Sequence, residues 1–299
     1  MGQYSISDLE QLSNVKAHTI RVWEQRYGLL QPARTAANIR YYSDDDLRRL
    51  LNVASLCERG LRISAVARLS EHERAQAVGA LAGEAAAGHG PRINALVAAM
   101  LGLDEPLLHR LLGEAVAQLG LEPAMVEVVY PLLRRIGLSW QAGTLNAAQE
   151  HLVSQLVRQR LLVAADGLPA APAGAPRWLL FLPEGELHEL ALLFINYALR
   201  ARGQQVLFLG QNLPLADVEA ACRAFRPDAV ATVLTAVPAR ERVPAFAAEL
   251  RRRCPGPQLV FYGPLAQLVG TPPAGSHLPA LITDFLALIA VLGQLRAGQ

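Results

Sequence analysis

Residues 177–299 alternate short apolar runs with stretches of helical periodicity, and this alternation restricts the fold more than any other feature of the chain. The apolar runs occupy residues 178–182, 205–209, 229–234, 258–262 and 278–282. Helical patterns follow the first two runs at about residues 187–202 and 215–225. Strands that alternate with helices form βαβ units around a parallel sheet. We therefore predict a doubly wound, Rossmann-like α/β domain over residues 177–299.

The chain before this domain divides into a linker, an all-helical segment and a mixed N-terminal segment. Residues 168–176 are rich in Pro, Ala and Gly, which is typical of a linker. Residues 76–167 are rich in Ala and Leu, and Gly or Pro separates their helical patterns, so we predict a four-helix bundle there. With residues 1–75 as a further domain, the expected fold class is multidomain, α and α/β.

The composition excludes several protein classes. A hydrophobic fraction of 52% with 18% charged residues is enough to bury a large core, which rules out wholesale disorder. No apolar run reaches the length of a membrane span, and the polar N-terminus does not resemble a signal peptide. Three cysteines without a CxxC pair argue against a disulfide framework or a cysteine-rich zinc site. We expect a cytoplasmic protein with no membrane partner.

Residues 1–75 carry the pattern of a helix-turn-helix with a wing. Two short helices are expected at about residues 7–12 and 16–27, and Gly28 ends the second. Residues 29–42 are typical of an irregular loop or short hairpin that carries arginines. Although the formal net charge is only +2, the segment from residue 16 to residue 42 contains five basic residues against one acid, Glu24. Two short helices joined by a tight turn are typical of DNA-binding domains.

The second helix and the wing hold the candidate DNA contacts. In a helix-turn-helix the second helix places side chains at base edges, and basic groups nearby bind phosphates. The residues that we expect to contact DNA are His18, Thr19, Arg21, Arg26 and Tyr27 on the helix, and Arg34, Arg40 and Tyr42 in the wing. Tyr42 is expected to donate a hydrogen bond to a phosphate. Charge alone leaves open a second interpretation, an ordinary solvated helix with scattered arginines.

These residues resemble the winged helix-turn-helix of the MerR family of transcription regulators. The similarity covers about 70 residues and includes residues 5–9, the segment TIRVWEQRYGL at residues 19–29, Arg34, and residues 38–47. The resemblance implies that the protein binds double-stranded operator DNA as a dimer or a higher oligomer. Over 200 residues follow this segment, so the small effector domain of the usual MerR proteins does not account for the sensor.

His188 lies where a doubly wound sheet binds its ligand. Such folds bind ligands outside the carboxyl ends of their strands, and the loop at residues 183–188 follows the first predicted strand. Glu186 can accept the second N–H of the imidazole and orient it, as carboxylates do beside metal-bound histidines. The alternative is a histidine that starts a helix, and position alone does not separate the two interpretations.

The same loop resembles the DxHxxG motif of cobalamin-binding domains, in which the histidine is the lower cobalt ligand. Residues 186–191 keep the acid and the histidine. Upstream, Trp140 is followed after nine residues by Glu150 and His151, which resembles the helical cap of the light-responsive, cobalamin-binding repressors of the MerR family, the CarH and LitR group.

This resemblance implies a repressor and photoreceptor that binds adenosyl- or methylcobalamin between the helical cap and the α/β domain, with cobalt held by His188. Ligand binding would control oligomerisation, as a dimer or tetramer, and operator binding. The residues implied in cofactor binding are Trp140, Gln141, Glu150, His151, Glu186, His188, Thr235, Val237 and Gly263.

The motifs differ from that group at several positions. Ala191 stands where the loop motif has Gly, and Gln141 stands where the light-sensing repressors carry a histidine. A carboxamide is a poor cobalt ligand. Thr235 and Val237 replace a Ser and a Leu, and Pro264 occupies the second position of an expected Gly-Gly pair. The alternative is therefore a MerR-type regulator that has lost cobalamin or binds another ligand, such as a different tetrapyrrole. We identify no segment for a catalytic domain and expect no enzyme.

Overall fold

The computed structural model describes residues 4–13, 15–34, 40–58, 60–74, 76–77, 89–141 and 147–294. The chain forms two compact units, residues 1–153 and residues 154–299. The division falls inside the long helix α10 (Ala147–Asp166). The domain boundaries expected near residues 75, 167 and 176 therefore stay predictions.

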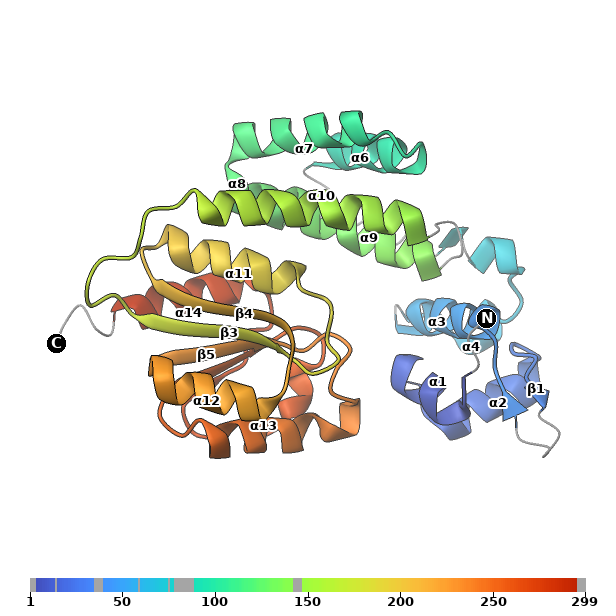
Figure 1. Cartoon of the computed structure of the whole chain (residues 1–299). Helices are drawn as coiled ribbons and strands as arrows, with labels where there is room; N and C mark the ends of the chain where they lie inside the picture. Colours follow the sequence, from blue (N-terminus) through green and yellow to red (C-terminus); the bar gives the residue numbers. More distant parts are fainter. Residues whose placement is uncertain are drawn as a thin grey trace. The chain divides into compact units, whose positions relative to one another are not determined.

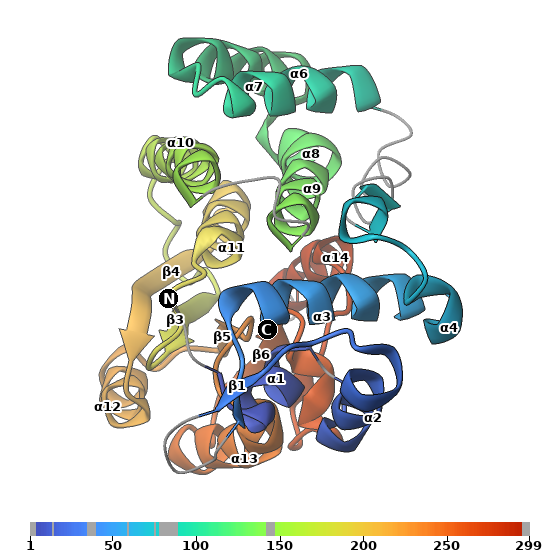
Figure 2. The same cartoon turned by 90° about the vertical axis from the view of Figure 1, so that its right-hand side faces the viewer.

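The N-terminal residues form the expected helix-turn-helix, with a short hairpin as its wing (Figure 2). The helices are α1 (Ile6–Ser13), α2 (Ala17–Tyr27), α3 (Asp44–Glu58) and α4 (Ile63–Val66), and β1 (Ala33–Arg34) pairs antiparallel with β2 (Arg40–Tyr41). Gly28 ends α2 because its φ of 62° lies in the left-handed region that other residues avoid. Leu9, Ile20 and Leu50 are buried in the core of these helices. Residues 35–39 of the predicted wing lie outside the described residues.

The helical segment that follows consists of α6 (Gly90–Leu101), α7 (Glu105–Leu119), α8 (Leu121–Ala124), α9 (Tyr130–Gln141) and α10. A π-helical turn at Met125–Val129 joins α8 to α9, so the described residues 89–141 and 147–166 contain four helical segments. A four-helix bundle over residues 76–167 stays a prediction. Asp104 caps α7 by accepting a hydrogen bond from the Leu107 N–H at 3.0 Å, and α6 and α7 pack side by side (Figure 2). In the described ranges no helix is both long and apolar enough to span a bilayer.

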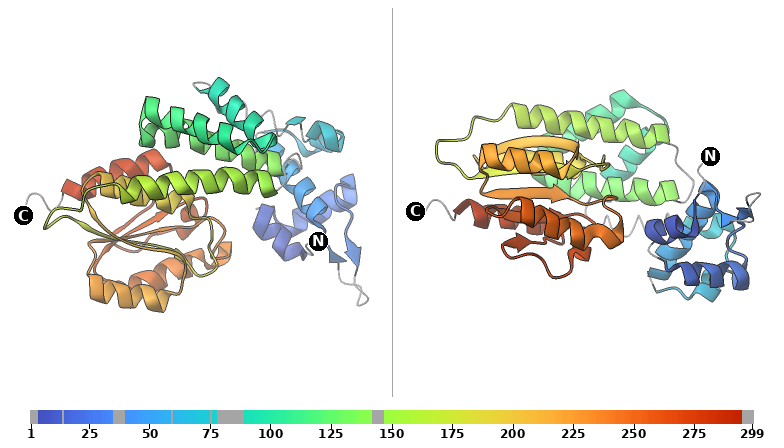
Figure 3. Two further views of the ribbon diagram at one scale, coloured as in Figure 1. Left: turned by 45° about the horizontal axis from the view of Figure 1, so that its top comes forward. Right: turned by 60° about the horizontal axis from the view of Figure 1, so that its bottom comes forward.

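The second unit is built on a parallel sheet with helices on both faces (Figure 1 and Figure 3). Its strands are β3 (Arg177–Pro183), β4 (Gln205–Leu213), β5 (Ala229–Val233), β6 (Gln258–Tyr262) and β7 (Ser276–His277). Helices α11 (Leu190–Ala201) and α14 (Ile282–Gln294) cover one face, and α12 (Leu215–Phe225) and α13 (Val243–Arg253) cover the other. Short 3-10 turns occur at Arg240–Arg242 and Ala266–Val269. The predicted doubly wound α/β fold is confirmed.

Side chains alternate between the two faces of this sheet, as the pleat of a strand requires. Leu179 and Phe181 of β3 belong to the core that also contains Val218 of α12 and Leu250 of α13. All the residues of β3 after Arg177 are buried, because helices cover both faces. The sheet therefore holds the carboxyl ends of its central strands rigidly in place.

One strand prediction is wrong. The apolar run at residues 278–282 is not a strand, because β7 is confined to Ser276–His277 and α14 begins at Ile282. Pro279 has no N–H to donate to a strand ladder, so the pairing cannot continue through this run. The Leu281 N–H instead donates to Asp284 Oδ2 at 2.9 Å, which favours the start of a helix.

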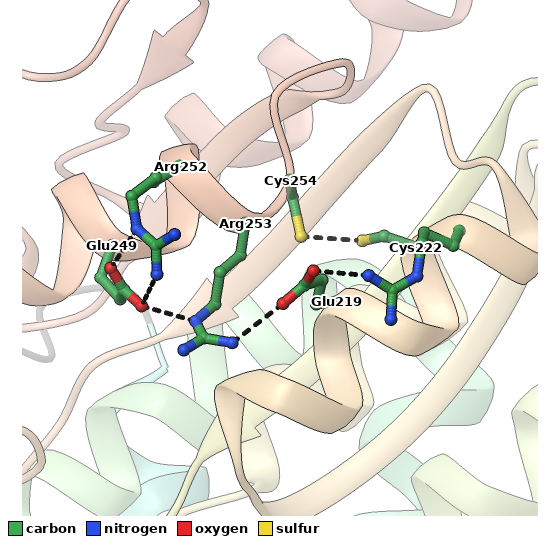
Figure 4. Close-up of polar contacts among 7 residues, drawn as sticks. Glu219, Cys222, Glu249, Arg252, Arg253 and Cys254 are labelled. Carbon is green, nitrogen blue, oxygen red and sulfur yellow. Dashed lines mark hydrogen bonds and ion pairs between the residues drawn. The ribbon is translucent and has the colours of Figure 1, made fainter.

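Polar contacts tie α12 to the end of α13 (Figure 4). Arg253 donates to Glu219 of α12 at 2.9 Å and to Glu249 at 2.6 Å. In the same region the Sγ atoms of Cys222 and Cys254 lie 3.1 Å apart, and both cysteines are buried free thiols. The two helices on this face are thus joined by an ion-pair network and by packed sulfur atoms.

Candidate functional site

The strand order reverses between β3 and β5. The order in the sheet is β4-β3-β5-β6-β7, so the chain moves from β3 to one side and then returns to the other. In doubly wound sheets, ligands bind at this point where the strand order reverses. The loops that leave it are residues 184–189 after β3 and residues 234–239 after β5. A ligand site is expected between these two loops.

A single buried carboxylate joins the two loops. Glu186 Oε1 accepts hydrogen bonds from the Leu187 and His188 backbone N–H groups, both at 3.0 Å. The other oxygen, Oε2, accepts from three consecutive backbone N–H groups of the loop after β5 at 2.7–3.1 Å, those of Thr235, Ala236 and Val237. The Glu186 side chain has no exposed surface. The loop after β3 is therefore fastened to the loop after β5 through this one side chain.

The hydrogen bonds keep Glu186 ionised in spite of its burial. Burial by itself raises the pKa of a carboxylate, because it removes water from the charged form. Here the bonds from the His188 side chain and from backbone N–H groups, including that of Ala236, outweigh burial and lower the pKa of Glu186 to about 2. The side chain is a carboxylate at neutral pH, and it only accepts hydrogen bonds.

Glu186 also selects the tautomer of His188. His188 Nδ1 lies 2.6 Å from Glu186 Oε1, and an ionised carboxylate requires the proton to be on Nδ1. In the neutral imidazole, Nε2 is then the nitrogen with the lone pair. The His188 side chain is 64% exposed, so the ring stands at the surface of the unit. The predicted orientation of His188 by Glu186 is present in the structure.

The loop that carries His188 is held from a second side as well. The Gly185 N–H donates to Asn212 Oδ1, and Gln211 Nε2 donates to the Leu187 carbonyl, both at 2.8 Å. Gly185 has a φ of 85°, which favours glycine at this turn. These bonds come from the end of β4, so three strand ends position one short loop.

An ion pair connects this loop to α10. Arg158 Nε lies 2.5 Å from Glu189 Oε1, and Glu189 is the residue after His188 and the N-cap of α11. Both residues belong to the second unit. The part of α10 that belongs to the second unit is therefore joined to the loop that carries His188.

The other predicted residues of the α/β domain lie in the same region. Thr235 and Val237 hold Glu186 through their backbone N–H groups. Gly263 has a φ of 104°, and a Cβ atom there would lie 2.7 Å from the Leu234 carbonyl oxygen, so glycine is required for this close approach. Thr232 is buried in β5, and its hydroxyl has no hydrogen-bond partner among the described residues. The structure thus brings the loops after β3, β5 and β6 together, while their contact with a cofactor stays a prediction.

The predicted cap residues lie at two helix ends. Trp140 and Gln141 are the last two residues of α9, where the structure describes the backbone only. Glu150 and His151 are in the first turn of α10, with His151 Nδ1 3.9 Å from Glu150 Oε2. These four residues belong to residues 1–153, and a cofactor shared with His188 stays a prediction for them.

The DNA-binding end presents one exposed helical face. His18, Arg21 and Arg26 of α2 are exposed, whereas Thr19 and Tyr27 are partly buried. Val22 and Gln25 are exposed on the same face, and neither was predicted from the sequence as a DNA contact. The signal that could have identified them is their spacing, because Val22 follows His18 and Gln25 follows Arg21 by four residues, about one turn of a helix. In the wing, Arg34 and Arg40 are exposed and stand opposite each other in the register of β1 and β2.

The prediction for Tyr42 is wrong. Tyr42 is fully buried, and its hydroxyl donates to Glu24 Oε2 at 3.0 Å rather than pointing to solvent. Burial and the neighbouring Glu24 carboxylate raise the pKa of Tyr42 to about 12. Glu24 also lies 3.4 Å from Arg40, so the one acid of this basic region is engaged within the domain. Tyr42 therefore positions Glu24 and the wing instead of contacting a phosphate.

Two family models match separate parts of the chain, and two curated repressors resemble most of it. Residues 4–73 match the MerR HTH family regulatory protein model, and residues 92–164 match the B12 binding domain model. The HTH-type transcriptional repressor CarH of Myxococcus xanthus is 38% identical over 267 residues, 87% of this chain and 88% of that protein. The repressor CarA of the same organism is 32% identical over 305 aligned residues, 98% of each chain.

A solved structure resembles the chain at the level of the fold. The Methanosarcina barkeri monomethylamine corrinoid protein matches with a TM-score of 0.55 and 16% sequence identity, over 68% of this chain and 99% of that one. The likeness to CarH and CarA, by contrast, extends over most of the sequence, including both matched domains. The chain therefore belongs to the MerR family of DNA-binding transcription regulators, in the group that carries a B12-binding domain and includes the repressors CarH and CarA.

Proposed function

We propose that the protein is a cytoplasmic transcription repressor whose C-terminal half senses a corrinoid, adenosyl- or methylcobalamin, with His188 as the cobalt ligand. The observation that carries this proposal is the Glu186–His188 pair at the reversal point of the sheet. Glu186 holds the proton of His188 on Nδ1, and this leaves the Nε2 lone pair as the donor to a metal. The B12 binding domain match supports the same ligand class, and the likeness to CarH and CarA supports the role of a repressor.

The residues present fit a corrinoid better than a bare metal ion. The described part of the chain holds no group of three or more His, Cys, Asp or Glu side chains that could bind a metal by themselves. A corrinoid would bring its cobalt already bound by its own ring, so one imidazole from the protein, that of His188, would be enough. Cobalamin, when bound, would supply a cobalt ion that accepts a neutral imidazole nitrogen.

The remaining predicted residues receive roles from the same proposal. Thr235, Val237 and Gly263 lie on the loops beside the Glu186–His188 pair, where they would contact the nucleotide tail of the corrinoid. Trp140, Gln141, Glu150 and His151 would cover the opposite side of the ring from the helical cap.

Regulation would follow from a shared ligand between the two halves. A ligand shifts a conformational equilibrium only when it binds one state better than another. A corrinoid held by both the cap and the α/β domain would favour one arrangement of the two, and with it one oligomeric state, dimer or tetramer, and one affinity for operator DNA. We propose light as the input, in line with the resemblance to light-responsive repressors.

The test is to identify the axial ligand by spectroscopy. Full-length protein is mixed with adenosylcobalamin, and its absorption spectrum is recorded in the dark and after illumination. The matched control is His72→Ala, because His72 is an exposed histidine of the first unit, far from His188 in the sequence. We expect the wild type and His72→Ala to bind the corrinoid with the same spectrum. His188→Ala should give a different spectrum or no retained colour. A His188→Ala spectrum identical to that of the wild type would remove His188 from the ligand role.

A second measurement does not depend on affinity. In reduced Co(II) corrinoid bound to protein labelled with ¹⁵N-histidine, an imidazole ligand splits each cobalt line of the electron paramagnetic resonance spectrum into a doublet. Unlabelled protein should give triplets instead. Triplets in both samples would mean that the nitrogen on cobalt belongs to the cofactor, against the proposal.

The alternative function is a MerR-type regulator that has lost cobalamin or binds a different tetrapyrrole. The observations that favour it are Ala191 in the first turn of α11, where the motif has Gly, and Gln141 at the end of α9. Protein purified from its native host would carry the spectrum of the resident ligand. Corrinoid bands would support the first proposal, and porphyrin-type bands or a colourless protein would support the alternative.

A further inference from the structure

The exposed face of α2 contains one apolar side chain among polar ones. His18, Arg21, Val22, Gln25 and Arg26 are all exposed, and their spacing of three and one residues places them on a single face of the helix. Val22 is 44% exposed and lies in the middle of this face. The opposite side holds Ile20, which is fully buried, and fixes the helix against the core.

A single exposed valine needs no explanation on an ordinary surface. Its surroundings make Val22 different, because the neighbouring exposed side chains all carry hydrogen-bonding groups and two are arginines. The nearby acid, Glu24, is turned toward Tyr42 and Arg40, at 3.0 Å and 3.4 Å. The face around Val22 is therefore cationic, which suits a polyanion and not an apolar protein partner.

Base edges in the major groove offer one apolar group to such a face. Each base pair presents hydrogen-bond donors and acceptors there, and thymine alone adds a C5-methyl group. Valine can neither donate nor accept a hydrogen bond, so a polar base edge opposite Val22 would lose water without compensation. A β-branched side chain also has few rotamers, and its methyl groups are held in place at little entropic cost.

We infer that Val22 is a specificity-determining residue of the operator contact, where its side chain packs against the C5-methyl group of a thymine in the major groove. This inference rests on the DNA-binding function of the family. It assigns to Val22 a role that charge-based selection of contact residues overlooks, since the contact involves no charge and no hydrogen bond.

The experiment combines a side-chain truncation with removal of the methyl group from DNA. The full-length protein, with and without adenosylcobalamin, first selects a binding sequence from a random duplex library. Each thymine of that sequence is then replaced by deoxyuridine, which lacks only the C5-methyl group. Dissociation constants are measured at fixed salt for the wild type, for Val22→Ala, and for the matched control Val163→Ala, an exposed valine of α10.

We expect one thymine per half-site at which the uracil replacement weakens wild-type binding about fourfold, the effect of one buried methyl group. Val163→Ala should show the same loss at that thymine. Val22→Ala should bind the thymine and uracil duplexes about equally, because the methyl group has lost its partner. Val22→Ala should also keep the melting temperature of the wild type, since Val22 lies outside the core.

Two outcomes would overturn the inference and leave the DNA-binding function intact. One is a uracil effect of the same size in the wild type and in Val22→Ala at every thymine. The other is a Val22→Ala variant with unchanged operator affinity and an altered oligomeric state, which would make Val22 part of a contact between protein chains. Failure to select any sequence in either ligand state would instead refute DNA binding itself.

Discussion

Replacing Glu186 by Gln should destabilise the second unit and release the loop after β5. The carboxylate accepts six hydrogen bonds: from the Leu187 N–H, from the His188 N–H and Nδ1, and from the three N–H groups of residues 235–237. A Gln side chain has one acceptor oxygen and one NH₂ group. At least one set of three donors would then face another donor instead of an acceptor.

The magnitude follows from the ionisation of Glu186. Its pKa is lowered from the ordinary value of 4.5 to about 2. At about 1.4 kcal/mol per pH unit, this difference means that folding favours the ionised side chain over the neutral one by about 3 kcal/mol. Glu186→Gln, which is always neutral, should therefore lower the free energy of unfolding by about 3 kcal/mol at pH 7.

The pH dependence has a definite sign. Because the folded pKa lies below the unfolded one, the unfolded chain takes up the proton first as the pH falls. The stabilisation by Glu186 is complete above pH 4.5 and is lost as the pH approaches 2. The difference between the wild type and Glu186→Gln should thus shrink to about 1 kcal/mol at pH 3.

Urea unfolding followed by tryptophan fluorescence measures this difference, since Trp178 of β3 is buried in the second unit. Glu184→Gln is the matched control, because Glu184 is exposed in the same loop, and it should change stability little. Hydrogen exchange at the amides of residues 235–237 should accelerate in Glu186→Gln only. A stability difference below about 0.5 kcal/mol at pH 7, or one that does not change between pH 7 and pH 3, would refute this account of Glu186.

Three further predictions concern other parts of the chain. Gly263→Ala should lower the free energy of unfolding in urea by about 2–3 kcal/mol, because its Cβ would lie 2.7 Å from a backbone oxygen at a positive φ. Gly256→Ala, where a Cβ would meet nothing within 4 Å, should be nearly neutral, and equal effects of the two variants would contradict the close approach at Gly263. Tyr42→Phe should lower the free energy of unfolding by about 1 kcal/mol, because it removes the hydrogen bond from the Tyr42 hydroxyl to Glu24. The salt dependence of DNA binding should not change, and a smaller dependence in the variant would mean that Tyr42 contacts a phosphate after all. When native protein is treated with a thiol reagent, the partly buried Cys57 should react first, and the buried Cys222 and Cys254 should react only after unfolding. Equal reaction rates for the three thiols would contradict the packing around α12 and α13.

Local patterns were sufficient for much of the architecture. The alternation of apolar runs and helical stretches predicted four of the five strands of the sheet, because each strand is a short run that the chain buries on both faces. The second helix and its end at Gly28 were predictable, since left-handed φ values favour glycine whatever the rest of the fold does. The run at residues 278–282 failed because a short apolar segment has no periodicity that separates a strand from a helix start.

The sequence alone also placed Glu186 beside His188, because residues two apart in one loop are neighbours in any fold. It could not show that the same carboxylate binds the N–H groups of residues 235–237, which lie 49–51 positions further along the chain. Nor could it show that Tyr42 turns inward to Glu24, 18 positions away, although both residues look equally available in a basic segment. Periodicity and spacing record interactions within a few residues, whereas these partners meet only after the sheet and the core of the N-terminal helices have formed. Tertiary packing alone decides which polar groups face solvent and which face each other.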